Sequence, residues 1–548
     1  MSPSSPGAGR LGGTPEQSAS GGARATAVMT VGTVISRITG VARLAAIAAA
    51  LGVAETRFTD TYNLANTFPN IVYELILGGI LTSVFVPVFV ELLEKEGRDR
   101  AWEVASGILN LAVVVLSAVT ILGILAAPWI AKLYALRLEG DQVAHQREAL
   151  TFLLRLFIPQ IVFYAITAIT AGLLNAHRRF GAPMYTPILN NLAVVAVFVV
   201  FHQLYGRVTL ESVTTSQMLL IGLGTTGGVL LMALAQLPFL RGLGKYRPTL
   251  RFRHPSFAKL ARLSVFVIGY VIVNQIGYFV VQILANEQQG GYTAYVNAFM
   301  FFMLPHGLFA VSVITALLPG MSALAVAEDW RGFAGRLATG ARATVFLVLP
   351  AAVGYFVLGE PIVRLLVERG VVTERSTELI AGVLRVFVVG LVPFSLFQLL
   401  LRAFYALQDT RTPFLVNCGA VALTTGLNVP LFHLYGVRGL AAGHACGYVA
   451  GAVAQERLLA RRLGHDRAEA LLGGVARTAA AAAAMGAVVW LAWRGVLAVT
   501  EPGTVAATLG EVVVPVAAGA ASYLAFAKLL AVPELEHVRS LVRRRKPS

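Results

Sequence analysis

Long hydrophobic runs separated by short polar segments dominate this chain of 548 residues. Many of the runs contain no Lys, Arg, Asp or Glu and approach the ~20 residues that a membrane-spanning helix needs. The pattern predicts fourteen spans, at residues 25–52, 61–92, 104–131, 152–176, 183–206, 213–240, 260–286, 292–320, 338–359, 380–406, 412–435, 439–460, 476–497 and 504–531. We therefore expect an all-α polytopic membrane protein.

Composition and charge support this interpretation. Hydrophobic residues make up 57% of the chain and charged residues only 13%, whereas soluble domains are about one quarter charged. The net charge of +16 is spread over short loops and a tail from Arg543 to Lys546. That distribution is typical of orientation in an anionic membrane and does not indicate nucleic acid binding. Cys418 and Cys446 both lie in predicted spans, so neither a disulfide framework nor a zinc site is expected.

Three pairs of short motifs indicate an internal repeat. AHRRFGAP (176–183) and ALQDTRTP (406–413) are 230 residues apart, as are two LYG motifs, and LTSVFVP (81–87) is echoed 232 residues later by ITALLP. Spans one to six thus correspond to spans seven to twelve. Six is even, so the two halves enter the membrane from the same side and are related by an axis along its normal. Such repeats place a substrate site between the halves near the midplane.

The repeat and the loop charges divide the chain. The link 241–262 contains seven basic residues and no acid, and basic residues favour the loops after even-numbered spans, so both termini are expected in the cytoplasm. The predicted parts are a disordered cytoplasmic tail (1–22), an N-lobe (23–240), a basic cytoplasmic linker (241–262), a C-lobe (263–462), two further helices (463–531) and a basic cytoplasmic tail (532–548).

Two arginines lie inside the first span. Arg37 is about 18 Å along a helix that starts at Ala25, and Arg43 follows at a different angle. An arginine at the bilayer centre costs roughly 2.5–3.5 kcal/mol, so both need partners or a hydrated cavity. Guanidinium groups stay charged and suit bidentate phosphate binding. One interpretation is a site for phosphate or pyrophosphate; the other is internal ion pairing with Asp60 or Glu74.

The second span carries a polar stripe. Asn63, Asn66, Asn70 and Glu74 recur at helical spacing after Asp60, and a proline favours a kink within the stripe. A polar, kinked helix that faces a cavity fits this pattern, and hydrogen bonding between helices is the alternative.

The second half is less charged. Asn274, Gln275, Asn417 and Thr424 are expected to be packing residues, and His306 a buried core histidine. We find no P-loop, nucleophile elbow or HExxH motif, so catalytic residues, metal ligands and cofactors are not expected, and the protein is predicted not to be an enzyme.

The chain resembles the MurJ/MviN family of proposed lipid II flippases, within the multidrug/oligosaccharidyl-lipid/polysaccharide exporter superfamily. The motifs that carry the resemblance are SRITGVAR (36–43), TDTYNLANTFPN (59–70), LTSVFVP (81–87), RRFGAPMYTPILNN (178–191) and ALQDTRTP (406–413). The resemblance implies that Arg37 and Arg43 match the two essential arginines of the first helix. It also implies that Asp60 matches the aspartate of the second helix, and Asn70 the asparagine of its turn.

The chain also departs from the family pattern. Many members have an additional arginine where this chain has Tyr73, an Asp-Arg pair where it has Phe299 and Met300, and a basic residue at Glu74. Spans seven and eleven contain no acid to support a sodium site like the one described for the family.

The expected function is therefore movement of lipid II, an undecaprenyl-pyrophosphate-linked disaccharide-peptide, to the outer leaflet of the bacterial plasma membrane. Arg37 and Arg43 would hold the pyrophosphate, with Asp60, Asn70 and Glu74 in the substrate site. Expected partners are the anionic lipid-linked substrate, the bilayer and cell-wall synthesis proteins. Three alternatives remain: a flippase for another polyprenyl-linked glycan, a drug/cation antiporter of the same superfamily, and a membrane scaffold that does not transport.

Overall fold

The computed structural model describes residues 15–74, 86–140, 142–177, 179–247, 255–463, 468–500 and 504–535. All regular structure in these ranges is helical. The first half contains α1 (Pro15–Leu51), α2 (Arg57–Tyr73), α3 (Val86–Lys95), α4 (Arg98–Tyr134), α5 (Gln142–Phe157), α6 (Gln160–Ala176), α7 (Gly181–Tyr205), α8 (Thr215–Gln236) and a 3₁₀ turn (Leu237–Leu240).

The second half repeats this order and then adds two helices. It contains α9 (Pro255–Glu287), α10 (Gly291–Pro305), the π turn η4 (His306–Ala310), α11 (Val311–Val326), α12 (Trp330–Val367), α13 (Glu374–Val389), α14 (Leu391–Ala406), α15 (Arg411–Tyr435), α16 (Val437–Leu463), α17 (Ala468–Val499) and α18 (Val505–Leu529).

Within the described residues, eleven helical segments are long and apolar enough to cross a membrane. A twelfth is formed if α13 and α14, which meet at 49°, make one bent span. The other two predicted spans, 61–92 and 439–460, correspond to α2 with α3 and to α16. The fourteen-span prediction is therefore consistent with the structure. The middle of span two, residues 75–85, lies outside the described residues.

The two halves match helix by helix. α7 and α15 are both 25 residues long and start 230 residues apart. Each ends at a glycine with positive φ, +60° at Gly206 and +59° at Gly436, a conformation that glycine adopts without steric penalty. α5 and α13 are both 16 residues long. The prediction of two pseudo-symmetric six-helix lobes is confirmed.

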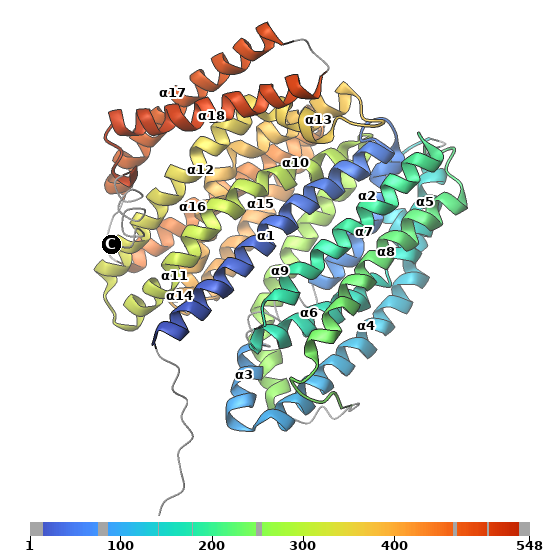
Figure 1. Cartoon of the computed structure of the whole chain (residues 1–548), viewed down its shortest axis with the longest axis horizontal. Helices are drawn as coiled ribbons and strands as arrows, with labels where there is room; N and C mark the ends of the chain where they lie inside the picture. Colours follow the sequence, from blue (N-terminus) through green and yellow to red (C-terminus); the bar gives the residue numbers. More distant parts are fainter. Residues whose placement is uncertain are drawn as a thin grey trace, which may run out of the picture.

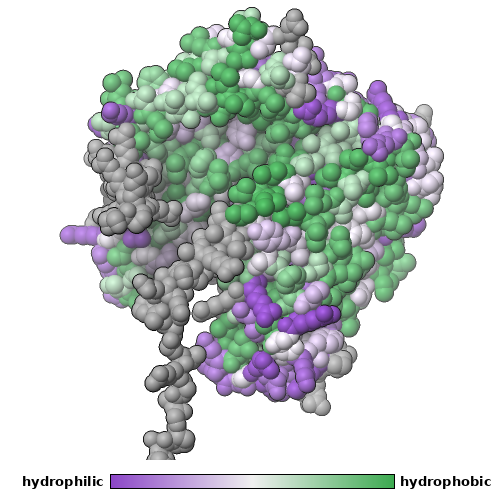
Figure 2. All heavy atoms as spheres, in the orientation of Figure 1, coloured by the Kyte–Doolittle hydropathy of each residue, from purple (hydrophilic) through white to green (hydrophobic). Residues whose placement is uncertain are grey.

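α1 belongs to the N-lobe and lies at its boundary with the C-lobe. In the N-lobe α7 packs against α1 and α8, and in the C-lobe α15 packs against α9 and α16. Figure 1 shows α1 running across the middle of the molecule, with α4, α5 and α8 on one side and α12 and α16 on the other. Hydrophobic residues cover most of the face drawn in Figure 2, and hydrophilic residues gather at its lower end and at its upper right. This distribution fits a bundle that crosses a membrane between two polar ends.

α16 is less hydrophobic than most of the other helices and packs closely against its neighbours in the C-lobe. Gly443, Gly447 and Gly451 follow one another at intervals of four residues. A Cβ at these positions would meet Asn428, Thr424 and Phe397 of the neighbouring helices. The glycines therefore allow the close helix approach that is typical of membrane bundles.

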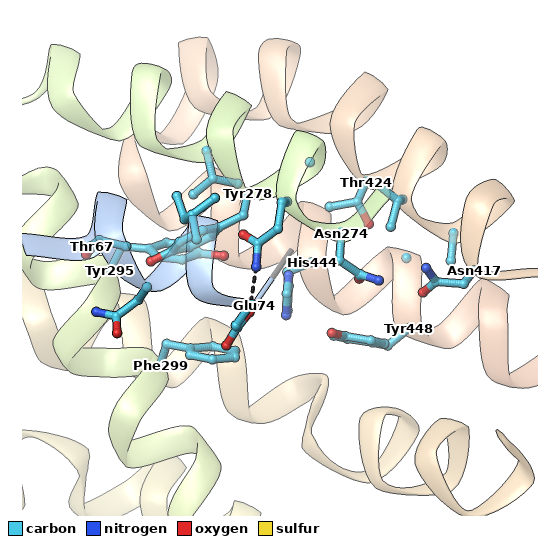
Figure 3. A pocket seen from close by; sticks show the side chains of 18 residues that line it. Thr67, Glu74, Asn274, Tyr278, Tyr295, Phe299, Asn417, Thr424, His444 and Tyr448 are labelled. Carbon is cyan, nitrogen blue, oxygen red and sulfur yellow. Dashed lines mark hydrogen bonds between the residues drawn. The ribbon is translucent and has the colours of Figure 1, made fainter. Parts of the chain in front are cut away.

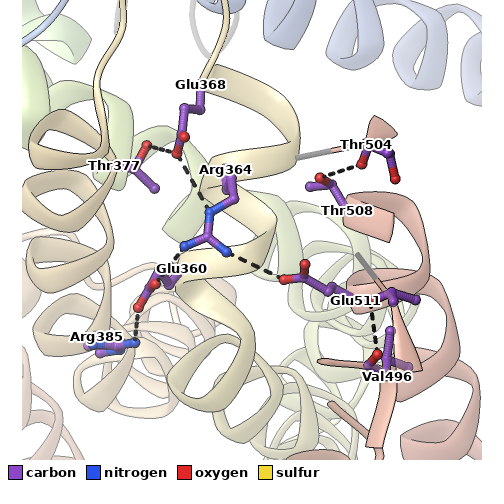
Figure 4. Close-up of polar contacts among 10 residues, drawn as sticks. Glu360, Arg364, Glu368, Thr377, Arg385, Val496, Thr504, Thr508 and Glu511 are labelled. Atoms are coloured by element: carbon purple, nitrogen blue, oxygen red, sulfur yellow. Dashed lines mark hydrogen bonds and ion pairs between the residues drawn. The ribbon is translucent and has the colours of Figure 1, made fainter. Parts of the chain in front are cut away.

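α17 and α18 form a hairpin outside the repeat and pack on α12. Arg364 of α12 pairs with Glu511 of α18 at 3.4 Å and with Glu360 of its own helix at 2.9 Å (Figure 4). Near the opposite end of the hairpin, Arg342 of α12 pairs with Glu534 at 2.9 Å. The hairpin is thus attached to the C-lobe by ion pairs at both of its ends.

Two predicted boundaries need correction. α1 begins at Pro15, so residues 15–22, which were expected to be disordered, are helical; Pro15 is at the first helical position, where proline is favoured. α9 begins at Pro255, so the end of the basic linker 241–262 is helix. Residues 1–14, 248–254 and 536–548 lie outside the described residues, so the structure does not test the predictions for them.

Hydrogen bonds between described residues of the two lobes gather at one end of the bundle, where α1 ends and α2 begins; we call it the closed end. Arg57 donates to the carbonyls of Asn286 and Glu287, at 2.9 and 3.1 Å. Gly290, with φ +74°, precedes α10, and a Cβ there would lie 2.6 Å from Cα of Ala54. Only glycine fits this close contact between the lobes without a steric clash.

Glu55 adds a carboxylate to the closed end. It lies in the loop between α1 and α2 and accepts hydrogen bonds from the Thr373 backbone at 2.7 Å and the Ser376 hydroxyl at 2.8 Å. Burial alone would raise the pKa of Glu55. The hydrogen bonds from Thr373, Val53 and Ser376 outweigh burial and lower the pKa below its ordinary value.

This pKa shift predicts a pH dependence of the closed end. A carboxyl whose pKa is lowered by folding stabilises the closed end above its ordinary pKa, and that contribution is lost as the pH falls through the lowered value. We expect the lobes to separate more readily below about pH 4.5. Spin labels at Glu139→Cys and Glu374→Cys, with Cys418 and Cys446 replaced by serine, would report the distance.

Glu55→Gln supplies the control, because glutamine does not titrate. The variant should show weaker closure at neutral pH and a smaller additional change on acidification. An identical pH response in both proteins would show that other groups control the closed end.

Candidate functional site

Arg43 is half-buried on the side of α1 that faces the N-lobe. Its guanidinium is within electrostatic range of the phenol groups of Tyr62 in α2 and Tyr164 in α6. The side chain of Asn70 in α2 also lies close to Tyr164. The N-lobe groups known to lie near Arg43 are therefore neutral phenols.

Arg37 lies nearer the C-lobe. Its side chain is exposed, and its Nη2 atom is 3.8 Å from the position that a Cβ on Gly307 would occupy, in the π turn η4. One turn further along α1, Gly40 faces Met300 of α10 and Asn191 of α7. The two arginines thus approach opposite lobes from one helix.

Neither arginine is paired with the acids considered from the sequence. No ion pair between these fully described residues joins Arg37 or Arg43 to Asp60 or Glu74. The internal ion-pair alternative is therefore wrong for this conformation. Both guanidinium groups keep their hydrogen-bonding capacity for an anionic ligand.

Asp60 is fully buried at the closed end. One carboxylate oxygen accepts from the backbone of Gly290 at 2.7 Å, and the other accepts from the backbone and hydroxyl of Thr293, at 2.8 and 2.6 Å. These donors lie at the N-terminus of α10, where free N–H groups and the helix dipole favour an anion. Asp60 therefore joins the lobes, and the structure does not bring it to the arginines.

The polar stripe of α2 divides between two roles. Asn63 donates to the Thr293 hydroxyl at 3.1 Å and so belongs to the closed end. Asn70 and Glu74 line a cavity of about 390 Å³ between the lobes. Glu74 accepts a hydrogen bond from Gln275 of α9 at 2.5 Å, and this contact also crosses between the lobes (Figure 3).

Apart from further residues of α2, the rest of the cavity is formed by the C-lobe helices α9, α10, α15 and α16. Figure 3 shows the labelled side chains converging on the space around Glu74 and His444. The other lining residues are Thr67, Ile71, Asn274, Gly277, Tyr278, Val281, Tyr295, Phe299, Asn417, Ala420, Val421, Thr424, Gly447 and Tyr448. Arg37 and Arg43 are not among them, so the site residues predicted from the sequence fall into separate places.

Several lining residues were expected only to pack between helices. Asn274, Gln275, Asn417 and Thr424 face the cavity, whereas His306 is buried and within hydrogen-bond distance of Ser395, as predicted. The sequence analysis missed His444 and Tyr448. Their spacing of four residues on α16, beside the glycine stripe, was the available signal.

Two pseudo-symmetric helical lobes with a cavity between them are the architecture of membrane transporters that are built from internal repeats. A family model described as "Lipid II flippase MurJ" matches residues 47–508. The chain belongs to the lipid II flippase MurJ family. It is a multi-pass protein of the bacterial inner membrane, and its family is one of transporters.

Curated relatives match most of the chain. "Lipid II flippase MurJ" of Burkholderia cenocepacia is 29% identical over 416 residues, covering 74% of this chain and 78% of the relative. "Probable lipid II flippase MurJ" of Rhizobium meliloti is 30% identical over 467 residues, covering 83% and 84%. The family match begins after Arg37 and Arg43, so it does not test their role.

Solved structures share the fold. "Lipid II flippase MurJ, inward closed conformation" matches with a TM-score of 0.73 and 22% identity, over 94% of this chain and 99% of that one. A structure titled as an inward-facing multidrug resistance MATE family transporter of the MOP superfamily matches with a TM-score of 0.65 and 13% identity, over 80% and 98%.

The contacts of Asp60 predict its effect on closure. Asp60→Ala would leave buried N–H groups of Gly290 and Thr293 unsatisfied, at about 1–3 kcal/mol each. We expect a population with separated lobes, measured as longer distances between spin labels at Glu139→Cys and Glu374→Cys. Asp60→Asn, which keeps one acceptor oxygen, should separate the lobes less. Equal distances in Asp60→Ala and the unsubstituted protein would refute the assignment.

Proposed function

We propose that this chain moves lipid II from the inner to the outer leaflet by alternating access. Its family and its two lobes with a cavity between them support this function. The observation that carries the proposal is that two intramembrane arginines approach opposite lobes without a carboxylate partner from α2.

The pyrophosphate is the part of the substrate that matches these arginines. Planar guanidinium groups form bidentate hydrogen bonds with phosphate oxygens and remain charged at any physiological pH. Arg43, beside Tyr62 and Tyr164, would bind from the N-lobe side, and Arg37, beside Gly307, from the C-lobe side. Asn70, which lies close to Tyr164, would orient the head group next to Arg43.

The acids take other roles in this proposal. Asp60 holds the closed end together and is released when the lobes separate there. Glu74 repels phosphate and so keeps the pyrophosphate on the arginine side of α2. Neither acid needs to touch the pyrophosphate.

Both termini are proposed to lie in the cytoplasm, because basic residues favour the loops on that side. The closed end then faces outward, and the lipid enters from the inner leaflet. Outward movement of negative charge across an inside-negative membrane is favourable by about 2.3 kcal/mol per charge per 100 mV. Transport would therefore need neither a cofactor nor a chemical step on the substrate. Cell-wall synthesis proteins that use lipid II are proposed partners.

An apolar groove gives the polyprenyl chain a place beside the C-lobe. It has a volume of about 370 Å³ and lies between α12, α14, α16 and α17, where Ala341, Leu400, Ala452 and Val475 line it. The attachment of α17 and α18 to α12 keeps this groove next to the C-lobe. The lipid tail would lie in the groove while the head group crosses between the lobes.

The role of the arginines predicts a loss of transport on substitution. We expect Arg37→Ala and Arg43→Ala each to lower lipid II transport at least about tenfold, because a charged hydrogen bond contributes roughly 1.5–3 kcal/mol. Arg37→Lys and Arg43→Lys should keep part of the activity. The measurement is lipid II in the outer leaflet of cells that depend on this chain.

Arg494→Ala is the matched control, since Arg494 lies on α17 and its Cζ is 5.6 Å from the centroid of the Trp490 ring. It should transport normally. If depletion of the chain causes another polyprenyl-linked glycan to accumulate, the substrate is that glycan. Normal lipid II transport by both Arg37→Ala and Arg43→Ala would contradict the proposed role of the arginines and favour the alternative of a membrane scaffold that does not transport.

The groove predicts a dependence on lipid length. Ala341→Trp would fill part of the groove, so transport of lipid II with its full polyprenyl chain should slow severalfold, with little change for a short-chain analogue. Ala517→Trp, on an exposed position of α18, is the control. Equal slowing of both lipids by Ala341→Trp would argue against a tail-binding groove.

A further inference from the structure

We infer that the cavity between α2 and the C-lobe binds the carbohydrate of the lipid-linked substrate. This inference rests on the proposed function and assigns a different part of the molecule to each half of the site. The arginines take the pyrophosphate, and the cavity takes the sugars attached to it.

Unsatisfied polar atoms provide the first argument. Within the described part of the chain, Oε1 of Gln275, Nδ2 of Asn417 and Nε2 of His444 are buried without a hydrogen-bond partner, and all three residues line the cavity. They offer an acceptor, a donor and an imidazole nitrogen that can act as either. A ligand rich in hydroxyl and acetamido groups satisfies all three, because it presents donors and acceptors together.

The charge of the cavity supports the same ligand. Among the described residues that line it, Glu74 is the one with an acidic or basic side chain, apart from the imidazole of His444. A phosphate would be repelled there and would leave the Gln275 oxygen unsatisfied. Neutral hydroxyl groups can donate to both carboxylate oxygens of Glu74 and replace the hydrogen bond from Gln275.

Aromatic side chains form much of the remaining lining. Tyr278, Tyr295, Phe299 and Tyr448 come from three C-lobe helices. Their faces can pack against the C–H faces of sugar rings while the neighbouring amides bind the hydroxyls. A cavity of about 390 Å³ is within the usual range for ligands of this size.

The position of Asn70 connects the two parts of the site. Asn70 lines the cavity and also lies close to Tyr164, whose phenol is within electrostatic range of Arg43. In polyprenyl-linked glycans the first sugar is bonded directly to the pyrophosphate. A pyrophosphate at Arg43 therefore places its sugar beside Asn70, at the edge of the cavity.

The test compares two lipids that differ in the carbohydrate. The full-length protein in nanodiscs would be titrated with lipid II and with undecaprenyl pyrophosphate, which has no sugar. We expect Asn417→Leu and His444→Phe to weaken lipid II binding about fivefold to tenfold and to leave undecaprenyl pyrophosphate binding unchanged. Arg37→Ala should weaken binding of both lipids.

Asn428→Leu is the matched control. Asn428 is a buried asparagine of α15, the helix that also carries Asn417, but it does not line the cavity. It should not change the ratio of the two affinities. The ratio also separates a local effect from a general loss of folded protein.

Three results would overturn the inference. The first is unchanged lipid II binding in both cavity variants, and the second is equal weakening of binding for both lipids. The third is a loss of binding in the cavity variants that depends on the sodium concentration equally for both lipids. The last would indicate a cation site. If the unsubstituted protein binds neither lipid, the proposed function itself fails.

Discussion

The cost of placing a guanidinium in the membrane is the constraint from which the architecture follows. Arg37 and Arg43 could have been neutralised by the two acids of α2, which would have locked α1 and α2 into a static pair. Instead Asp60 binds the N-terminus of α10, and Glu74 accepts from Gln275. The charges of opposite sign are thus kept apart, and the arginines retain the capacity to bind an anion that arrives from the membrane.

The acids at the closed end hold the lobes together and do not pair with Arg37 or Arg43, so closure of the lobes and binding of an anion use different groups. Asp60 satisfies backbone N–H groups of α10, an interaction that lasts only while the lobes are together. Arg57 and Glu55 add contacts of the same kind at this end. Because all of these groups depend on backbone donors and acceptors at helix ends, a shift of one lobe breaks them together. The closed end is therefore suited to behave as one cooperative contact.

Much of the fold could be predicted from the sequence, because spans and repeats depend on local hydropathy and on short motifs. The repeat became visible at Gly206 and Gly436, where a turn requires glycine in both halves. The site was less accessible. The sequence identified Asp60 as unusual, but its partner Thr293 is 233 residues away, and only the packing of the lobes brings them together. His444 was missed because one histidine on a glycine-rich helix has no pattern that separates a cavity from a core.

A ligand can shift the equilibrium between two states only as far as it binds one of them more tightly. A pyrophosphate held by α1 alone would bind equally before and after the lobes move. A substrate whose pyrophosphate contacts Arg43 on the N-lobe side, and whose sugars occupy a cavity formed mainly by the C-lobe, does depend on the lobe positions. It also competes for Glu74 and Gln275, which join the lobes inside that cavity. Division of the head group between two lobes thus gives this transporter a physical means to couple binding to movement.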